Sequence, residues 1–309
     1  MTEAAYYPGS IVSIPSGEHE ILALLHHGDP DHPARAGRPA VLRLHGLMGN
    51  LLDETEAFLS EALISHGITS MTINTLLSNL GLVYGFGIFE DAMPQIATAI
   101  SYLREAGHNR VVVAGHGLGA CMAIRYGALS HSMTKEAQVD GVIGIAPPWS
   151  LPETVEARWD RFSSSPSYRQ VCDQVQAMKS APERTEAAQD RTILIRRAHG
   201  ETDTPQHTDI FTLRTWDAIV GPDAEGTRCH LHIGGIASPT LLISGTDDTI
   251  VPSSDIDRLA AQAEAHGRTV DVQHLPADHT FSRKHAELAE TVVAWIEKRV
   301  EAQVSAEVG

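Results

Sequence analysis

The sequence is poor in cysteine, in basic residues and in long apolar runs. Its 309 residues include 3 cysteines (Cys121, Cys172 and Cys229), an odd number at wide spacing, so we expect no disulfide framework. Lysine and arginine number 23 against 39 for aspartate and glutamate, and the resulting formal charge of −16 disfavours nucleic acid and anionic membranes as partners. No apolar run reaches the about 18 residues of a membrane span.

Several sequence motifs are also missing. The first residues do not show the basic and then apolar order of a signal peptide, so we expect a cytoplasmic location. The chain has no dinucleotide fingerprint and no phosphate loop, so we expect no nucleotide cofactor. Its histidine-rich turn at 26–32 has no second ligand cluster at a suitable spacing, so we expect no metal. The expected partner is a small-molecule substrate, and the sequence does not indicate an oligomeric state.

What the sequence does contain is a regular alternation of apolar runs and amphipathic segments. The alternation predicts an α/β fold, with a mostly parallel, doubly wound sheet covered by helices on both faces. Strands are predicted in SIVSIP, HEILALLHH, AVLRLHG, ITSMTIN, RVVVAG, DGVIGIA, SPTLLISG and TVDVQHLP, and helices over residues 53–66, 88–106, 118–129, 253–266 and 283–302.

The alternation breaks between residues 148 and 236. Helical fragments and polar stretches replace it there, which indicates an inserted helical cap (148–236) on a core made of residues 1–147 and 237–309. Tryptophans are common in protein cores, but Trp149 and Trp216 are also candidates for lining an apolar substrate pocket in this region.

The most informative stretch is VVVAGHGLGACMAIRYG, residues 111–127. It predicts a strand that enters a helix through a tight glycine-rich turn. Such a turn is the setting of a nucleophile elbow, Gly-x-Ser-x-Gly. Here the middle position is Gly117, and no hydroxyl stands where the motif has one.

Three further motifs follow predicted strands. They are His45-Gly46-Leu47-Met48-Gly49-Asn50, Gly245-Thr246-Asp247-Asp248 with Ile250-Val251-Pro252 after it, and Ala277-Asp278-His279. In this order and together with the elbow, they resemble the α/β-hydrolase superfamily, in its capped esterase, lipase and acyl-hydrolase branch. Open α/β sheets build their sites at the carboxyl ends of their strands, which is where all four motifs lie.

The resemblance implies a role for each matched position. His279 would be the base and Asp248 its acid partner, with Asp247 as the alternative acid. The backbone N–H groups of Leu47 and Leu118 would form an oxyanion hole. We also expect His45, beside the oxyanion loop, to contact substrate.

Gly117 leaves three functions open. The first is an enzyme that works without a serine nucleophile, in which His279 acts as a base on a substrate carbon acid or on water, as in an isomerase, cyclase, lyase or epimerase. The second is an ordinary esterase or thioesterase whose serine was replaced by Gly117. The third is a binding protein that keeps only the pocket. Loss of a triad nucleophile costs about 10⁶ in turnover, so acyl-enzyme chemistry is not expected from the sequence as it stands.

Overall fold

The computed structural model describes residues 9–29, 38–52, 54–81, 83–180, 191–197 and 207–301, and the side chains of 54–57 and 207 are outside this description. Eight strands form one sheet in the order β1-β2-β4-β3-β5-β6-β9-β10. Strands β4 to β10 of this order run parallel, and β1 and β2 are antiparallel to their neighbours. The strands are β1 (Ser10–Ser16), β2 (His19–His26), β3 (Ala40–Leu44), β4 (Ser70–Ile73), β5 (Val111–His116), β6 (Gly141–Ile145), β9 (Thr240–Gly245) and β10 (Asp271–Leu275).

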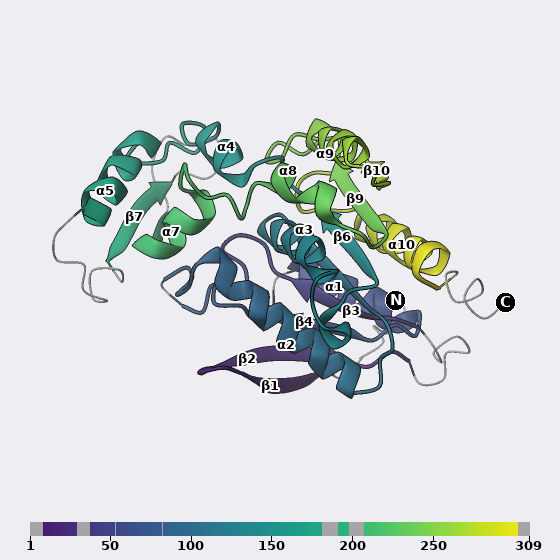
Figure 1. Cartoon of the computed structure of the whole chain (residues 1–309). Helices are drawn as coiled ribbons and strands as arrows, with labels where there is room; N and C mark the ends of the chain where they lie inside the picture. Colours follow the sequence, from purple (N-terminus) through teal and green to yellow (C-terminus); the bar gives the residue numbers. More distant parts are fainter. Residues whose placement is uncertain are drawn as a thin grey trace, which may run out of the picture.

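Helices cover both faces of this sheet (Figure 1). One face packs against α2 (Ala92–Glu105), α3 (Leu118–Ser130) and α9 (Ser254–Ala265). The other packs against α1 (Glu54–Ser65) and α10 (His285–Trp295), which continues as the π-helical η4 (Ile296–Glu301). The prediction of a mostly parallel, doubly wound sheet is therefore confirmed. In the described part of the chain, no helix combines the length and apolar character needed to cross a bilayer.

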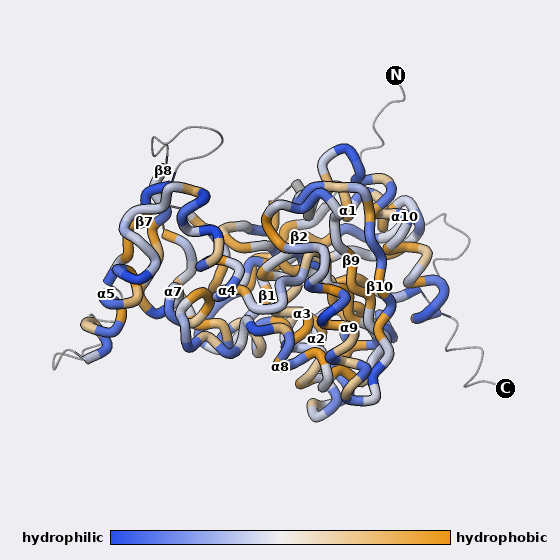
Figure 2. The backbone as a smooth tube through the Cα atoms, turned by 90° about the horizontal axis from the view of Figure 1, so that it is seen from above, coloured by the Kyte–Doolittle hydropathy of each residue, from blue (hydrophilic) through white to orange (hydrophobic). Residues whose placement is uncertain are grey.

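The central strands are apolar because both of their faces are covered. Every residue of β3, β5, β6 and β9 is buried, so these strands show continuous apolar runs and no alternation with polar residues. Along the backbone, apolar segments gather around α3, α9 and β9, and polar segments lie mainly at the outer turns (Figure 2). Because β3, β5, β6 and β9 run parallel, their carboxyl ends lie at the same edge of the sheet.

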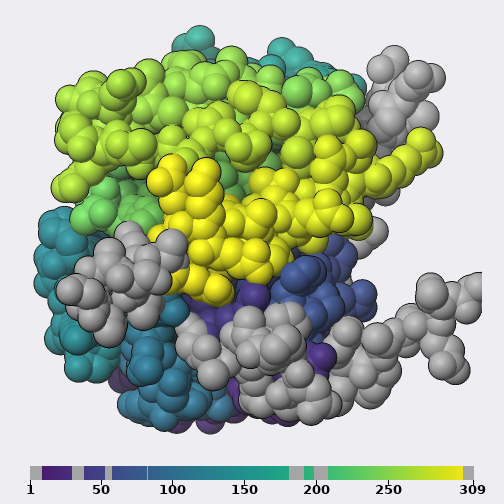
Figure 3. Space-filling model, turned by 90° about the vertical axis from the view of Figure 1, so that its right-hand side faces the viewer, coloured from purple at the N-terminus to yellow at the C-terminus, as the bar shows by residue number. Residues whose placement is uncertain are grey.

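The C-terminal helix closes the second face of the sheet. Side chains of α1 and α10 share one apolar cluster that includes Leu63, Leu288 and Val292. Figure 3 shows this side of the molecule, where the yellow C-terminal segment lies against the dark blue α1 region. Residues almost 230 positions apart in sequence thus hold one layer together.

The segment between β6 and β9 adds no strand to the main sheet within the described residues. It contains α4 (Leu151–Glu156), α5 (Tyr168–Ser180), β7 (Thr192–Arg197), β8 (His207–Thr212), α7 (Leu213–Val220) and α8 (Cys229–His232). We call residues 146–239 the insert; α5, β7 and α7 group to one side of the main sheet (Figure 1). The insert is not only helical, because β7 and β8 form an antiparallel pair.

Close backbone approach sets the position of α3 on the sheet. A Cβ on Gly119 would lie 2.1 Å from the carbonyl oxygen of Leu44, and one on Gly115 would lie 2.1 Å from the carbonyl oxygen of Gly119. Neither distance is possible for a real side chain, so the first turn of α3 can pack this tightly against β3 and β5 only with glycine at both positions.

We expect Gly119→Ala to destabilise the fold by about 3 kcal/mol, because the backbone of β3 would have to move. Urea denaturation monitored by circular dichroism measures this loss. Gly107→Ala is the matched control: its Cβ would meet nothing within 4 Å, and its positive φ of 98° costs only backbone strain, of order 1–2 kcal/mol. Equal destabilisation by the two variants would contradict the packing argument.

Candidate active site

Gly117 forms a sharp turn between β5 and α3. Gly117 connects the last residue of β5, His116, to the first residue of α3, Leu118. Its φ of 55° and ψ of −109° are strained for residues with a side chain, and its N–H donates to the carbonyl of Ile145 at 2.9 Å. Glycine takes this conformation without steric cost.

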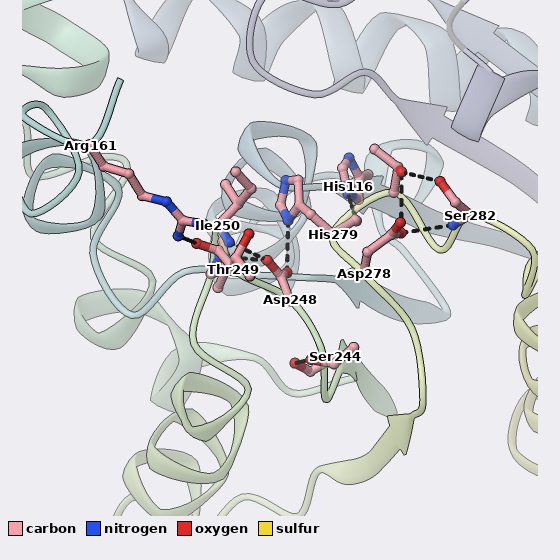
Figure 4. Close-up of polar contacts among 12 residues, drawn as sticks. His116, Arg161, Ser244, Asp248, Thr249, Ile250, Asp278, His279 and Ser282 are labelled. Carbon is pink, nitrogen blue, oxygen red and sulfur yellow. Dashed lines mark hydrogen bonds and ion pairs between the residues drawn. The ribbon is translucent and has the colours of Figure 1, made fainter. Parts of the chain in front are cut away.

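A histidine–aspartate pair faces Gly117. His279 Nδ1 lies 2.8 Å from Asp248 Oδ2 (Figure 4). His279 Nε2 lies 3.9 Å from the position that a Cβ on Gly117 would occupy. The pair and the elbow therefore meet at one place, although they are separated by more than 130 residues in sequence.

Asp248 is well placed to stay ionised. Its carboxylate is buried and accepts hydrogen bonds from the N–H groups of Ile250 at 2.6 Å and Val251 at 2.8 Å. Burial raises the pKa of Asp248, but the hydrogen bond from His279 and the two backbone N–H groups outweigh burial and leave this pKa below its usual value. Asp247, the alternative acid, is exposed, and the structure pairs His279 with Asp248.

The ends of β9 and β10 bring this pair together. A Cβ on Gly245 would lie 2.2 Å from the carbonyl oxygen of Ala277, so the two loops touch through their backbones. The N–H of Asp247 also donates to the Ala277 carbonyl at 3.0 Å. The loop that carries Asp248 and the loop that carries His279 therefore form one unit.

The backbone N–H groups of Leu47 and Leu118 lie near Gly117. Leu118 is the first residue of α3, so its N–H has no acceptor within the helix. Leu47 belongs to a tight turn closed by a 3.1 Å hydrogen bond from Gly49 to Gly46, in which Met48 takes a left-handed φ of 63°. Both leucines line the cavity described below. In the described part of the chain, neither N–H donates to a protein acceptor.

His116 packs beside His279 and is hydrogen-bonded to its backbone. Its Nε2 donates to the backbone carbonyl of His279 at 2.9 Å, and the two rings are 4.6 Å apart. Burial, together with repulsion from His279, lowers the pKa of His116 to about 3, so this ring is neutral. Sequence reasoning missed this role, because a histidine beside an elbow glycine carries no signal of its long-range partner.

The expectation that His45 contacts substrate is wrong. Its side chain is fully buried and does not line the cavity. Its Nδ1 donates to the carbonyl of Gly46 at 2.9 Å, and its Nε2 lies 2.9 Å from the hydroxyl of Thr75 and 2.8 Å from that of Ser78. Burial lowers its pKa to about 4. His45 thus fastens the turn that carries Leu47 to the loop after β4.

The two tryptophans assigned to substrate binding also lie elsewhere. Trp216 is 0% exposed in the apolar core of the insert. Trp149 is stacked on His230, with ring centroids 4.5 Å apart, and the guanidinium of Arg258 covers it. Neither ring lines the cavity at Gly117. Both are held by packing partners that the sequence pattern does not reveal.

The cavity has a volume of about 460 Å³ and is built from both parts of the chain. The core contributes Gly46, Leu47, His116, Gly117, Leu118 and His279, among others. The insert contributes Leu151, Thr154, Val155, Arg158, Phe162 and Arg197. Among the described residues, no group of three or more histidine, cysteine or carboxylate side chains could hold a metal ion.

A known family matches this architecture. The hydrolase family described as serine aminopeptidase, S33, matches residues 81–275. This chain belongs to that family of α/β-hydrolases. The matched range contains the elbow and Asp248, and His279 follows four residues after its end. No curated protein sequence matches the chain.

Solved esterases have the same fold. Est1E from Butyrivibrio proteoclasticus is 13% identical with a TM-score of 0.62, over 94% of this chain and 99% of that one. The Pyrococcus furiosus esterase Pf2001 is 15% identical with a TM-score of 0.60, over 95% and 94%. The esterase domain of a Rhodothermus marinus protein is 16% identical with a TM-score of 0.58, over 95% and 99%. At such identities the likeness concerns the fold.

The buried histidines give the fold a pH dependence. The pKa values of His45 and His116 are lowered to about 4 and about 3 in the folded chain, against about 6.5 when unfolded. Below about pH 6.5 the unfolded chain therefore binds more protons than the folded chain. The contribution of these histidines to the free energy of unfolding is full above that pH and falls as the pH drops. Between about pH 7 and pH 5, the free energy of unfolding should fall by about 2 kcal/mol for each of the two histidines.

Urea denaturation at several pH values across this range measures how the free energy of unfolding changes with pH. We expect His45→Gln to lower the proton uptake on unfolding by about one at pH 5, because one buried titrating ring is removed. His131→Gln, at an exposed position, should leave the slope unchanged. An unaltered slope in His45→Gln would mean that His45 is not held neutral.

Proposed function

We propose that this chain is an enzyme that acts on the carbonyl group of a small, largely apolar acyl compound without a serine nucleophile. The observation that carries the proposal is the convergence of His279, Asp248 and the N–H groups of Leu47 and Leu118 on Gly117, which has no side chain. The insert serves as a cap, because it supplies one wall of the cavity.

Each group has a defined part in such a reaction. His279 Nε2 takes a proton from water or from a carbon next to the substrate carbonyl. Asp248 holds the ring through Nδ1 and stabilises the cation that forms. The two N–H groups, with the positive end of the α3 dipole behind Leu118, stabilise the oxyanion or enolate. If water attacks, the proton on His279 passes to the leaving group.

The absence of a side chain at position 117 rules out an acyl-enzyme at that position. Cys121 does not replace the missing nucleophile, since it is buried one helical turn further on, with its Sγ 3.5 Å from Cys229 Sγ. Removal of a nucleophile still leaves catalysis of about 10³–10⁴ over water through the oxyanion hole and binding. A nucleophile-independent mechanism would use this remaining rate enhancement.

A serine esterase or thioesterase whose nucleophile was replaced by glycine is the second candidate. Two observations favour it. A Cβ at position 117 would meet nothing closer than His279 Nε2 at 3.9 Å, and the fold is that of solved esterases. Under this candidate, the remaining site is a complete serine-hydrolase site that lacks one hydroxymethyl group.

We expect Gly117→Ser to hydrolyse short activated esters with a burst of product, because Asp248 and His279 are already in place to activate the new hydroxyl. The burst should be followed with chromogenic esters of several acyl lengths, and a fluorophosphonate should label the variant but not the original chain. The backbone strain of a serine here is of order 1–3 kcal/mol.

Gly117→Ala is the matched control, since it carries the same strain without a hydroxyl. Combining Gly117→Ser with His279→Ala should abolish the burst. A folded Gly117→Ser variant that gives neither burst nor turnover would exclude the esterase candidate. The nucleophile-independent enzyme or a binding protein would then account for the site.

In the original chain, we expect slow hydrolysis of activated esters without a burst, and His279→Ala should reduce its rate by about 10²–10⁴, the usual contribution of a general base. Asp248→Asn should lower the rate as well, because the ring loses its orienting partner. The rate is measured as a function of pH against His131→Gln as control. Unchanged rates in both variants would indicate a non-catalytic binding protein.

A further inference from the structure

The wall that the insert contributes to the cavity is apolar apart from its basic end. Leu151, Thr154, Val155 and Arg158 all line the cavity, at the spacing of one helical face. Backbone hydrogen bonds carry the helical turns of α4 past its end, from Ala157 to Glu153 and from Phe162 to Arg158. A cationic side chain is therefore placed on the same face as the apolar residues.

The charged side chains that line the cavity are basic. They are Arg158 and Arg197, and among the described residues no aspartate or glutamate side chain lines the cavity. The chain as a whole carries a formal charge of −16, so a basic pocket is opposite in sign to its surroundings. A site of this kind attracts anions against the field of the rest of the protein.

The two arginines differ in their partners. Arg197 is neutralised by the buried Asp209, with Nε 2.6 Å from Oδ2, and its guanidinium lies over the ring of Trp159. For Arg158, the described residues provide no ion pair and no side-chain hydrogen bond. The carboxylates of Asp248 and Asp255 attract it electrostatically but form no hydrogen bond or ion pair with it.

Those carboxylates are already engaged. Asp248 holds His279, and Asp255 accepts from the N–H of Trp149 at 2.8 Å and pairs with Arg258 at 3.3 Å. Glu153, five residues before Arg158, pairs with Arg228 at 2.8 Å. Burial, together with repulsion from Arg161, lowers the pKa of Arg158 more than Asp248 and Asp255 raise it.

We propose that Arg158 binds an anionic group of the substrate, so that the substrate is a carbonyl compound that also carries a carboxylate or a phosphate. This inference rests on the proposed function for the reacting carbonyl, which would lie at Gly117, and adds a specificity-determining contact. A guanidinium forms paired hydrogen bonds with either group, and such charge-assisted bonds are among the strongest that proteins make.

Binding to the intact original chain tests this without requiring any reaction. Isothermal titration calorimetry would compare monomethyl esters of linear dicarboxylic acids, from succinate to suberate, with the corresponding neutral dimethyl esters. Phosphonate analogues of the same lengths distinguish a phosphate site from a carboxylate site. We expect at least one anionic ester to bind about tenfold or more tightly than its neutral counterpart.

Variants locate the contact. Arg158→Gln should remove the preference for the anionic ester, and Arg158→Lys should keep part of it, because it keeps the charge without the paired geometry. Arg169→Gln, on the exposed surface of α5, should have no effect. His279→Ala should also retain the preference, so a failure of the proposed chemistry and a failure of this binding site give different results.

A preference that persists in Arg158→Gln would overturn the proposal, and so would the absence of a preference in the original chain for every length. A missing preference in the original chain would overturn the proposal even if Arg158→Gln does not fold. Thermal unfolding of each variant shows which case applies.

Discussion

The tight contact between the first turn of α3 and the ends of β3 and β5 is the constraint on which the site depends. Gly115 and Gly119 allow backbone to touch backbone there, at distances that no Cβ permits. The contact sets Leu118 at the edge of the sheet, next to the turn that carries Leu47. A second contact of the same kind, between Gly245 and Ala277, joins the loops of Asp248 and His279. Both contacts consist of backbone atoms, so the site rests on rigid elements.

Gly117 leaves this geometry unchanged. Its left-handed backbone and its hydrogen bond to Ile145 give the sharp turn of an elbow, and His279 stays beside it. The rest of the site is also well supported. Asp248 is held by two N–H groups, His116 binds the carbonyl of His279, and His45 ties down the turn of Leu47 (Figure 4 shows the first two). A base and backbone donors held in this way can act on a carbonyl without a nucleophilic side chain, which is the basis of the proposed function.

Parts of the insert escaped prediction for identifiable physical reasons. The strand β7 has the sequence TILIRR, and its apolar residues at positions 193 and 195 are buried while 192 and 194 are exposed. The sequence does not show this alternation, because Ile193, Leu194 and Ile195 form one apolar run. Its partner β8, HTDIFT, is mostly polar and carries no clear strand signal of its own, although it pairs with β7 along its length. Trp149 and Trp216 were assigned to the pocket because an indole suits either a pocket or a core. Only the packing partners show that both are structural: Trp149 stacks on His230, and Trp216 lies in the apolar core.

The sequence by itself determined the order and type of the core elements, since fully buried strands and amphipathic helices have distinct periodicities. It also determined that a glycine stands at the elbow and that a histidine and two aspartates follow later strands. Only the tertiary structure decided that His279 pairs with Asp248, that His116 supports it and that His45 lies away from the cavity. It alone placed Arg158 in the cavity wall beside carboxylates that are already paired. These outcomes depend on contacts between residues far apart in the chain, and local periodicity carries no information about such contacts.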